Sequence, residues 1–465
     1  MGIPFFHKNK PQPKLVAETQ DEQPKVKNIE TLKAGKLAKL ALALTATLIT
    51  QFGPRPTGSE ACLATAQSLH DSYEEFCDKA FIDEIPLHSE AFYLWIKILV
   101  ILYPSLLLLL WIGLPCIATA VLAFFVFYLV REAVLFKPLK ERWTKAKKGR
   151  NVWAAIEPKG EVKKTVIFSG HHDSAPLFKY NRLEKLPYYK KVLFPLLLCL
   201  LLAIECVLQL LTEILTGQLF SLGLPPTSLT IFLAFLSLGF PFVLGLWDFV
   251  SKEGSPGAGD NLVSSCMTIE LSRYFDWKRR SQEALDHTRL VFVSFDGEES
   301  GLRGSRMWFR EHRELLKGSL MLNFDCPYYA DQIKFLDKDV NGSVQLSSRL
   351  AHQMVVLAQG MGYPAKSQSI PFFSGGTDAA EGARAGIESC TLTAVAWGDQ
   401  RYPEVYHTAG DTVDAVEEKA IERAISLAVR FVELVDKDQL YEDEKPLMQE
   451  EDNEQQPQLH FKRLV

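Results

Sequence analysis

Imidazole and carboxylate side chains recur in this 465-residue chain directly after apolar segments or at the start of predicted helices. The segments concerned are His171-His172-Asp173, Asp260-Asn261, Asp296-Gly297-Glu298-Glu299, Asp325 and Tyr406-His407-Thr408. Imidazole nitrogens and carboxylate oxygens are both ligands that zinc accepts, at about 2.0–2.2 Å. Any one of these residues alone is usually structural or solvated, but their joint occurrence predicts a metal site.

The candidate ligands are sufficient for two metal ions. A catalytic zinc ion takes three protein ligands and keeps a further position open. Each of two ions obtains three ligands if one carboxylate is shared among the five candidates, which are His171, Asp260, Glu299, Asp325 and His407. We expect Asp260 to be the bridge, because its side chain is short and stands at a predicted helix start. Two zinc ions about 3.5–4 Å apart can activate water and polarise a carbonyl group together.

Three further carboxylates have predicted roles beside these ligands. Glu298 adjoins a ligand without being needed as one, which suits a general base acting on metal-bound water. Asp173 follows His171 by two residues and can accept the other ring N–H of that imidazole. Asp378, in the segment Gly375-Gly376-Thr377-Asp378, either lines the site or caps the helix that follows it.

The elements that must position these residues alternate between strands and helices. Strands are predicted near Ala80–Ile85 and at Asn151–Ile156, Thr165–Ser169, Arg289–Phe295 and Leu320–Phe324. Helices are predicted at Glu60–Cys77, Asn261–Phe275, Gly304–His312 and Glu417–Asp436. This alternation indicates an α/β fold with a mixed, largely parallel central sheet flanked by helices. Such sheets bind ligands at the carboxyl ends of their strands, where separated residues converge.

Two long apolar blocks indicate that part of the chain lies in a membrane. Residues 98–130 and 214–247 contain no charged side chain. One helix over 94–130 would be about 55 Å long, against a hydrocarbon core of about 30 Å, so we expect a hairpin broken at Pro104 and near Gly113–Pro115. A second hairpin is expected from 192 to 250, giving four crossings. Its Glu205 is expected to face another helix.

The predicted organisation is an α/β domain interrupted by the two hairpins. Its parts are residues 31–92, 132–191 and 251–436, with hairpins at 93–131 and 192–250, a disordered segment at 1–30 and an acidic disordered tail at 437–465. Residues 131–150 hold eight Lys or Arg against two acids, whereas the link 212–228 has no Lys or Arg. This asymmetry predicts a multi-pass membrane protein whose α/β domain is on the cytoplasmic face. The formal charge of −5 means that the chain has no overall positive field to attract nucleic acid, so no nucleic-acid partner is expected. The two apolar blocks instead predict a lipid bilayer as partner.

The motifs FGPRPTGSE, GHHDS, GAGDN, FDGEESGLRGS, LNFD and YHTAGDT, in this order, resemble the di-zinc aminopeptidases of metallopeptidase family 28. The resemblance covers about residues 30–92, 150–178 and 254–436. It implies two Zn²⁺ held by the five candidate ligands, with Glu298 as general base and Asp173 as the residue beside His171. The implied activity is hydrolysis of N-terminal residues from peptides with a free N-terminus.

The sequence departs from that family in two places and leaves alternatives open. The loop between Asp173 and Asp260 has 86 residues and carries a hairpin, so we expect the membrane surface to form one wall of the approach to the metals, favouring short or membrane-proximal peptides. Thr377-Asp378-Ala379 stands where the family usually has Ser-Asp-His, and the pocket for the first substrate side chain cannot be identified. A glutaminyl-cyclase-like acyltransferase is the first alternative, although Tyr406 stands where those enzymes tend to carry Trp. A non-catalytic membrane scaffold is the second, disfavoured because every ligand and the base are present.

Overall fold

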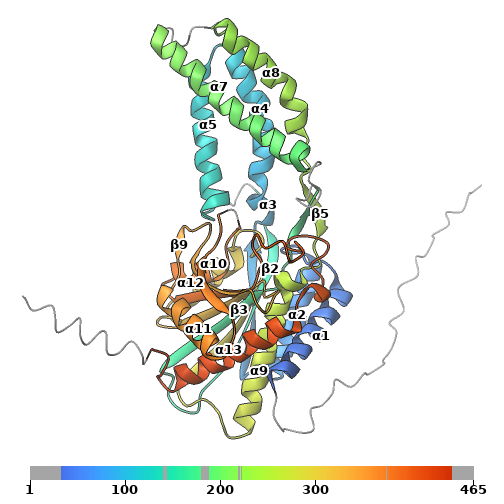
Figure 1. Ribbon diagram of the computed structural model, residues 1–465, viewed down its shortest axis with the longest axis vertical. Coiled ribbons are helices and arrows are strands. Elements are labelled where there is room, and N and C mark those ends of the chain that lie inside the picture. The colour runs from blue at the N-terminus through green and yellow to red at the C-terminus, as the bar shows by residue number, and fades with distance from the viewer. Residues whose placement is uncertain are drawn as a thin grey trace, which may run out of the picture. The chain divides into compact units, whose positions relative to one another are not determined.

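The computed structural model describes residues 33–139, 144–179, 188–217, 220, 222–372 and 374–441 (Figure 1). The predicted disordered segment at 1–30 and residues 442–465 of the predicted tail lie outside these ranges.

A nine-stranded mixed sheet forms the centre of the α/β part. Its order is β1 (Lys79–Leu87), β2 (Lys147–Ile156), β6 (Thr288–Phe295), β3 (Lys164–His171), β7 (Leu320–Asp325), β11 (Glu388–Thr393), β8 (Ile333–Asp339) and β10 (Ala365–Ser369), with β9 (Val344–Gln345) paired to β8. The four central strands β6, β3, β7 and β11 are parallel to one another, whereas the pairs β1–β2, β2–β6 and β8–β11 are antiparallel. The predicted fold class, a mixed sheet with a parallel centre, is confirmed.

The register of the central strands brings their carboxyl ends level with one another. His171 at the end of β3 pairs with Phe295 at the end of β6. Ser169 of β3 pairs with Asn323 of β7, two residues before each strand ends. The loops that follow these three strands therefore leave from the same edge of the sheet.

Helices cover both faces of the sheet, which is why β3 is an uninterrupted buried run and does not alternate. Adjacent residues of β3 point to opposite faces. On one face Phe168 contacts Phe431 of α13 (Glu418–Asp436), beside α1 (Ala34–Phe52), α2 (Glu60–Glu74) and α9 (Val263–Arg280). On the other face Ile167 belongs to a core with Trp308 and Phe309 of α10 (Arg303–His312). Helices α11 (Ser348–Gly360) and α12 (Ala379–Arg384) pack along β8 and β11.

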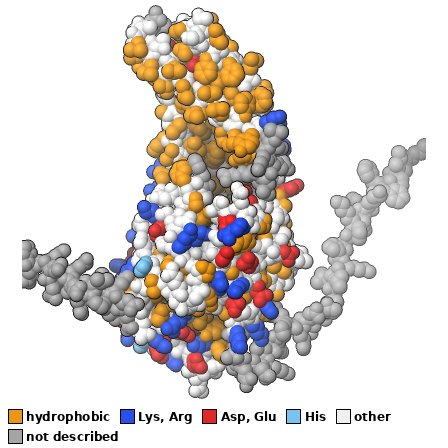
Figure 2. All heavy atoms as spheres, in the orientation of Figure 1, with side chains coloured by type: hydrophobic (Ala, Val, Ile, Leu, Met, Phe, Trp, Pro, Cys, Tyr) orange, Lys and Arg blue, Asp and Glu red, His pale blue; other side chains and the backbone are white. Residues whose placement is uncertain are grey.

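Four helices in the described residues are long and apolar enough to cross a membrane. They are α4 (Leu94–Trp111), α5 (Pro115–Leu129, continued by η1, Val130–Val134), α7 (Phe194–Thr216, preceded by η3, Tyr189–Leu193) and α8 (Thr227–Leu244). At 1.5 Å per residue an 18-residue helix is about 27 Å long, close to the hydrocarbon thickness. Figure 2 shows hydrophobic side chains over the surface of this part and charged side chains over the α/β part. The predicted number of apolar helices is confirmed.

The helices pack through an apolar core to which a few polar contacts are added. Glu205 of α7 is fully buried and accepts a hydrogen bond from Gln209 at 2.7 Å, so it lies inside the bundle as expected. The break predicted at Pro104 is wrong, because Pro104 lies within α4 and the chain turns at Ile112–Leu114. Neighbouring helices and local adjustments tolerate proline in such helices.

Candidate metal centre

The five predicted ligands reach one place from five elements. His171 and Asp325 are the last residues of β3 and β7, and Glu299 lies in the loop directly after β6. Asp260 lies in η4 (Ala258–Leu262), the turn that leads into α9. His407 lies in the long loop between β11 and α13. Because the carboxyl ends of β3, β6 and β7 are level with one another, His171, Glu299 and Asp325 converge.

Distances between the side chains match those between ligands of one metal ion. The Nε2 atom of His171 is 3.3 Å from Oδ1 of Asp260, and Nε2 of His407 is 3.0 Å from its Oδ2. Nε2 of His407 is also 3.4 Å from Oε2 of Glu299. Two ligands at about 2.0 Å from a tetrahedral zinc lie about 3.3 Å apart. The two oxygens of Asp260 thus face different histidines, which is the arrangement of a bridging carboxylate.

The second group of ligand atoms includes Asp325. His171, Glu298 and Asp325 have ligand atoms within 4.8 Å of one another, as do Asp260, Asp325 and Cys326. Oε2 of Glu298 is 3.7 Å from Nε2 of His171, a longer separation than those of the predicted ligand pairs. His171, Asp260 and Glu299 form a further such group. Asp260 therefore lies close to both histidines, and Glu299 has ligand atoms near both histidines as well.

Four buried atoms in this cluster have no hydrogen-bond partner, and they are His171 Nε2, Asp260 Oδ2, Glu299 Oε1 and His407 Nε2. The 3.0 Å approach of His407 to Asp260 is short, but its angles are not those of a hydrogen bond. Because buried polar atoms are nearly always paired, four such atoms aimed at one another fit a bound cation.

The charges of the cluster also fit a cation. Burial and the neighbouring carboxylates raise the pKa of Glu298 and of Glu299 well above the usual range. Burial and the charge of Asp260 raise the pKa of Asp325 to about 7 despite the opposing effect of His171. Burial lowers the pKa of His171, but Glu298, Asp173 and Asp260 together raise it well above the usual value. The carboxylates outnumber the cationic side chains here, and divalent metal ions would balance them.

Asp173 connects His171 to the loop that carries the two glutamates. Its Oδ1 is 3.3 Å from Nδ1 of His171, and it accepts hydrogen bonds from the backbone N–H groups of Glu298 and Glu299 at 3.3 and 3.2 Å. Thr57 donates its hydroxyl to the same carboxylate at 2.7 Å. Asp173 therefore contacts both the imidazole and the backbone of the glutamate loop, and its predicted role of orienting His171 stays a prediction.

Asp411 is a positioning residue that the sequence reasoning missed. Its two carboxylate oxygens accept the backbone N–H groups of Gly259 at 2.8 Å and Asp260 at 3.1 Å. A side chain at Gly259 would collide with the ring of Tyr328 at 2.0 Å, so glycine is required there. The peptide bond between Asp260 and Asn261 is cis. The only sequence signal for Asp411 was its place in the YHTAGDT motif.

Arg55 explains the FGPRPTGSE motif, for which the sequence suggested no role. Its buried guanidinium donates hydrogen bonds to the carbonyl groups of His172 at 2.9 Å, Gly257 at 2.8 Å and Gly53 at 2.9 Å. One side chain therefore joins the loop after β3 to the loop that leads to Asp260.

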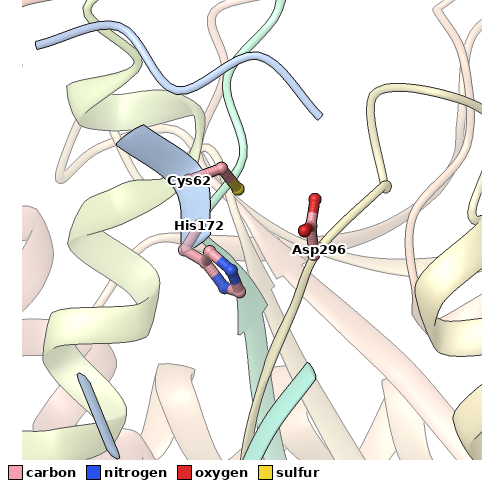
Figure 3. Close-up of side chains that lie close together, drawn as sticks. All are labelled: Cys62, His172 and Asp296. Atoms are coloured by element: carbon pink, nitrogen blue, oxygen red, sulfur yellow. The ribbon is translucent and has the colours of Figure 1, made fainter. Parts of the chain in front are cut away.

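A second cluster of Cys62, His172 and Asp296 lies close by and is also fully buried (Figure 3). Asp296 accepts hydrogen bonds from the thiol of Cys62 and from two backbone N–H groups, while Nδ1 of His172 is 2.8 Å from the hydroxyl of Ser294. Burial raises the pKa of the Cys62 thiol well above its usual value and lowers the pKa of His172 to about 3. A protonated thiol and a neutral imidazole beside the cationic Arg55 indicate hydrogen-bonded packing here.

Asp378 occupies the N-cap position of α12 but makes no capping hydrogen bond. Its carboxylate is fully buried, and burial together with Asp325 raises its pKa well above the usual value although His171 lowers it. It therefore lies near the metal cluster, which favours the first of its two predicted roles.

Comparisons with known proteins give one family match and several solved structures with a similar fold. Residues 243–432 match the sequence model of peptidase family M28. No curated protein sequence matches the chain. A glutaminyl cyclase from an Acidobacteriales bacterium has a TM-score of 0.50 at 13% identity, with 88% of this chain and 97% of that chain covered. A zinc aminopeptidase from Bacillus subtilis has a TM-score of 0.48 at 14% identity, with 84% and 93% covered. A Zn-dependent exopeptidase from Parabacteroides distasonis has a TM-score of 0.48 at 13% identity, with 84% and 97% covered.

Proposed function

Because residues 243–432 match peptidase family M28, we propose that the protein is a membrane-anchored di-zinc aminopeptidase that hydrolyses N-terminal residues from peptides. The observation that carries the proposal is the position of Asp260, whose two oxygens face His171 and His407 separately. If Asp325 is grouped with His171 and Glu299 with His407, the two sets share Asp260, and each of two metals would have three protein ligands. The residues present fit zinc, which accepts such nitrogen and oxygen ligands.

The proposed mechanism assigns separate tasks to the residues around the metals. When bound, two zinc ions supply Lewis acidity for the attacking water and for the scissile carbonyl. Glu298 accepts the proton of the water and returns it to the departing amino group. Asp173 keeps the Nε2 atom of His171 turned into the cluster by holding its Nδ1 side.

The proposed location follows from the four apolar helices and the charges that flank them. An even number of crossings returns the chain to one side, so all three parts of the α/β domain share that side. Arg131, Lys137, Lys190 and Lys191 flank the helix ends on the α/β side, and the link between α7 and α8 has no Lys or Arg. This distribution supports a cytoplasmic α/β domain bound to the inner face of a bilayer.

The glutaminyl-cyclase alternative has the same fold and therefore needs a chemical test. The purified full chain, loaded with zinc, is given three peptides of equal length that begin with leucine, N-acetyl-leucine and glutamine, and the products are identified by mass spectrometry. An aminopeptidase releases free leucine from the first peptide and nothing from the acetylated one. Loss of ammonia from the glutamine peptide without hydrolysis of the leucine peptide would establish the cyclase. Three unchanged peptides would favour the non-catalytic membrane scaffold.

A further inference from the structure

The metal cluster opens into a pocket of about 680 Å³ that is lined by many aromatic side chains. Glu298, Glu299 and His407 line the pocket on the metal side. We call Phe92, Tyr93, Phe136, Phe178, Phe249 and Trp397 the aromatic wall; the pocket is also lined by Tyr188, Tyr328, Tyr329, Tyr402 and Tyr406. A pocket of this size with an apolar wall suits a large apolar side chain.

Most of the aromatic wall comes from the segments that enter and leave the apolar helices. Phe92 and Tyr93 directly precede α4, and Phe136 follows η1 at the end of α5. Phe178 ends β4 (Pro176–Phe178), which pairs with β5 (Val250–Gly254) at the root of the second hairpin, and Phe249 directly precedes β5. Figure 1 shows α3 (Ser89–Phe92) and β5 at the boundary between the apolar helices and the α/β part.

This position in the chain determines the depth of the pocket relative to a membrane. Tyr and Trp residues at the ends of membrane-spanning helices, such as Tyr93 here, are enriched at the level of the lipid headgroups. All four helix ends on the α/β side contribute to the pocket, since Tyr188 directly before η3 also lines it. If the helices span a bilayer, the wall of the pocket lies at the interface and not in bulk water.

Direct contacts join the aromatic wall to the metal ligands. The hydroxyl of Tyr93 donates a hydrogen bond to the backbone carbonyl of Glu299 at 3.2 Å. The ring centroid of Phe178 is 6.2 Å from that of His407 and 5.0 Å from that of Phe249. A side chain lying on this wall would therefore belong to a residue whose peptide bond is at the metal centre.

One carboxylate of the pocket is available to a protonated amine. Among the described residues that line the pocket there are four carboxylates and no Lys or Arg. Glu298 and Glu299 belong to the metal cluster and Asp399 forms an ion pair with Arg401, which leaves Glu404. The apolar wall favours an apolar side chain next to the amine.

We propose that this aromatic pocket receives the N-terminal side chain of hydrophobic peptides that lie at the membrane interface. The substrate class is peptides with a free amino group and a large apolar first residue, such as leucine or phenylalanine, partitioned into the lipid surface. This inference rests on the proposed aminopeptidase function. It adds two points, namely that the substrate comes from the lipid surface and that the residue removed is large and apolar.

The first test compares aminoacyl amides on the zinc-loaded full chain in detergent. The kcat/KM for leucine and phenylalanine amides exceeds that for glycine and serine amides by at least about tenfold, because the pocket buries the apolar side chain. Phe249→Ala lowers kcat/KM for the phenylalanine amide about tenfold and leaves the glycine amide within about twofold. Phe124→Ala is the matched control, since Phe124 is 64% exposed on α5 and does not line the pocket, and it changes neither value.

Trp397→Ala repeats the comparison from a different element and keeps the test decisive if Phe249→Ala fails to fold. Equal kcat/KM for all four amides, or an equal loss on all of them in both pocket variants, would overturn the assigned pocket while leaving the aminopeptidase in place. No hydrolysis of any amide by folded, zinc-loaded protein would overturn the proposed function instead.

The second test addresses the membrane source of the substrate. The chain is reconstituted into phosphatidylcholine vesicles and given two peptides that both begin with leucine, one with an apolar continuation and one with a charged continuation. Partitioning raises the local concentration of the apolar peptide, so its apparent KM falls at least about tenfold relative to detergent while the charged peptide is unaffected. Identical changes for both peptides would overturn delivery from the bilayer.

Discussion

Asp260 is held in place by contacts of its backbone and of its side chain. Only the role of its side chain could be predicted from the sequence. The sequence identified the carboxylate as a bridge from its type and its place at a helix start, and its oxygens do face two histidines. The contacts of Asp411 and Arg55 are to backbone N–H and carbonyl groups. Nearly every residue type offers the same backbone N–H and carbonyl groups, so the sequence does not reveal which residues are their partners. These positioning residues were therefore found only in the structure.

The role of Glu298 is tested by Glu298→Gln. This variant keeps the ligand set but removes the base, so kcat falls by about 10² to 10⁴ while zinc content is unchanged. Elemental analysis and amide hydrolysis measure the two quantities, with Glu299→Gln as the comparison that loses zinc. Loss of zinc from Glu298→Gln alone would show that the roles of the two glutamates are exchanged.

Asp411→Asn tests the positioning of the bridging ligand. An amide can accept one of the two backbone hydrogen bonds but presents N–H groups to the other, so the segment around Asp260 loosens. Zinc affinity, measured by titration against a chelator, falls about tenfold to a hundredfold. Asp414→Asn is the control, because Asp414 is exposed three residues further on. Equal affinities for both variants would contradict this account of Asp411.

At the level of elements, the continuous apolar strands and four of the helices of the α/β part were predicted, whereas the helix α11, the strand β8 and the polar strands β10 and β11 were not. Strands β2, β3, β6 and β7 were found because burial on both faces requires continuous apolar residues. In contrast, β11 buries Ser389, Thr391 and Thr393, which are satisfied by partners such as the hydroxyl of Thr377, 2.6 Å from that of Thr391. The edge strand β10 is partly exposed and polar. Such strands depend on tertiary partners that composition does not reveal.

The last residue of α13 gives a pH-dependent prediction about stability. Asp436 accepts three hydrogen bonds, at 2.9 to 3.0 Å, from the backbone N–H groups of Asp286, His287 and Thr288 at the start of β6. Burial raises the pKa of Asp436, but these hydrogen bonds lower it below the usual value. A lowered pKa stabilises the fold above the unfolded-state value of about 4, and this contribution disappears as pH falls through the folded-state pKa.

Asp436→Asn therefore lowers the free energy of unfolding by about 1 kcal/mol at pH 7, a value reduced for the partial exposure of the group. Thermal unfolding in detergent at pH 7 and at pH 3 measures the difference from wild type, which shrinks at the lower pH. Asp414→Asn serves as the exposed control. A difference that is the same at both pH values would show that the charge of Asp436 is not involved.

At the scale of the whole molecule, the two hairpins place the metal centre beside the apolar helices. The loop after Asp173 leads through β4 to the second hairpin, and β5 leads from it toward Asp260. The sequence predicted the helices from their lack of charge, since a bilayer imposes length and composition directly. It could not predict the aromatic pocket, because the pocket is assembled from residues near all four helix ends.

Membrane orientation is tested with single added cysteines, Ser228→Cys at the start of α8 next to the link and Lys437→Cys after α13, both at exposed positions. An impermeant thiol reagent applied to intact cells labels Ser228→Cys and leaves Lys437→Cys unlabelled until the cells are opened. The unaltered chain, whose eight cysteines are free thiols that are buried or half-buried, gives the background. Labelling of Lys437→Cys alone would reverse the orientation, and labelling of both would contradict an even number of crossings.

The central claim is a two-metal centre that shares Asp260, and the zinc content of the purified full chain tests it most directly. The protein is saturated with zinc, freed of excess metal by gel filtration in detergent, and measured by elemental analysis against its own concentration. Two zinc ions per chain are expected for the wild type, with loss of metal in Asp260→Ala because that variant removes the ligand common to both sets. One zinc ion or none in the saturated wild type would contradict the account.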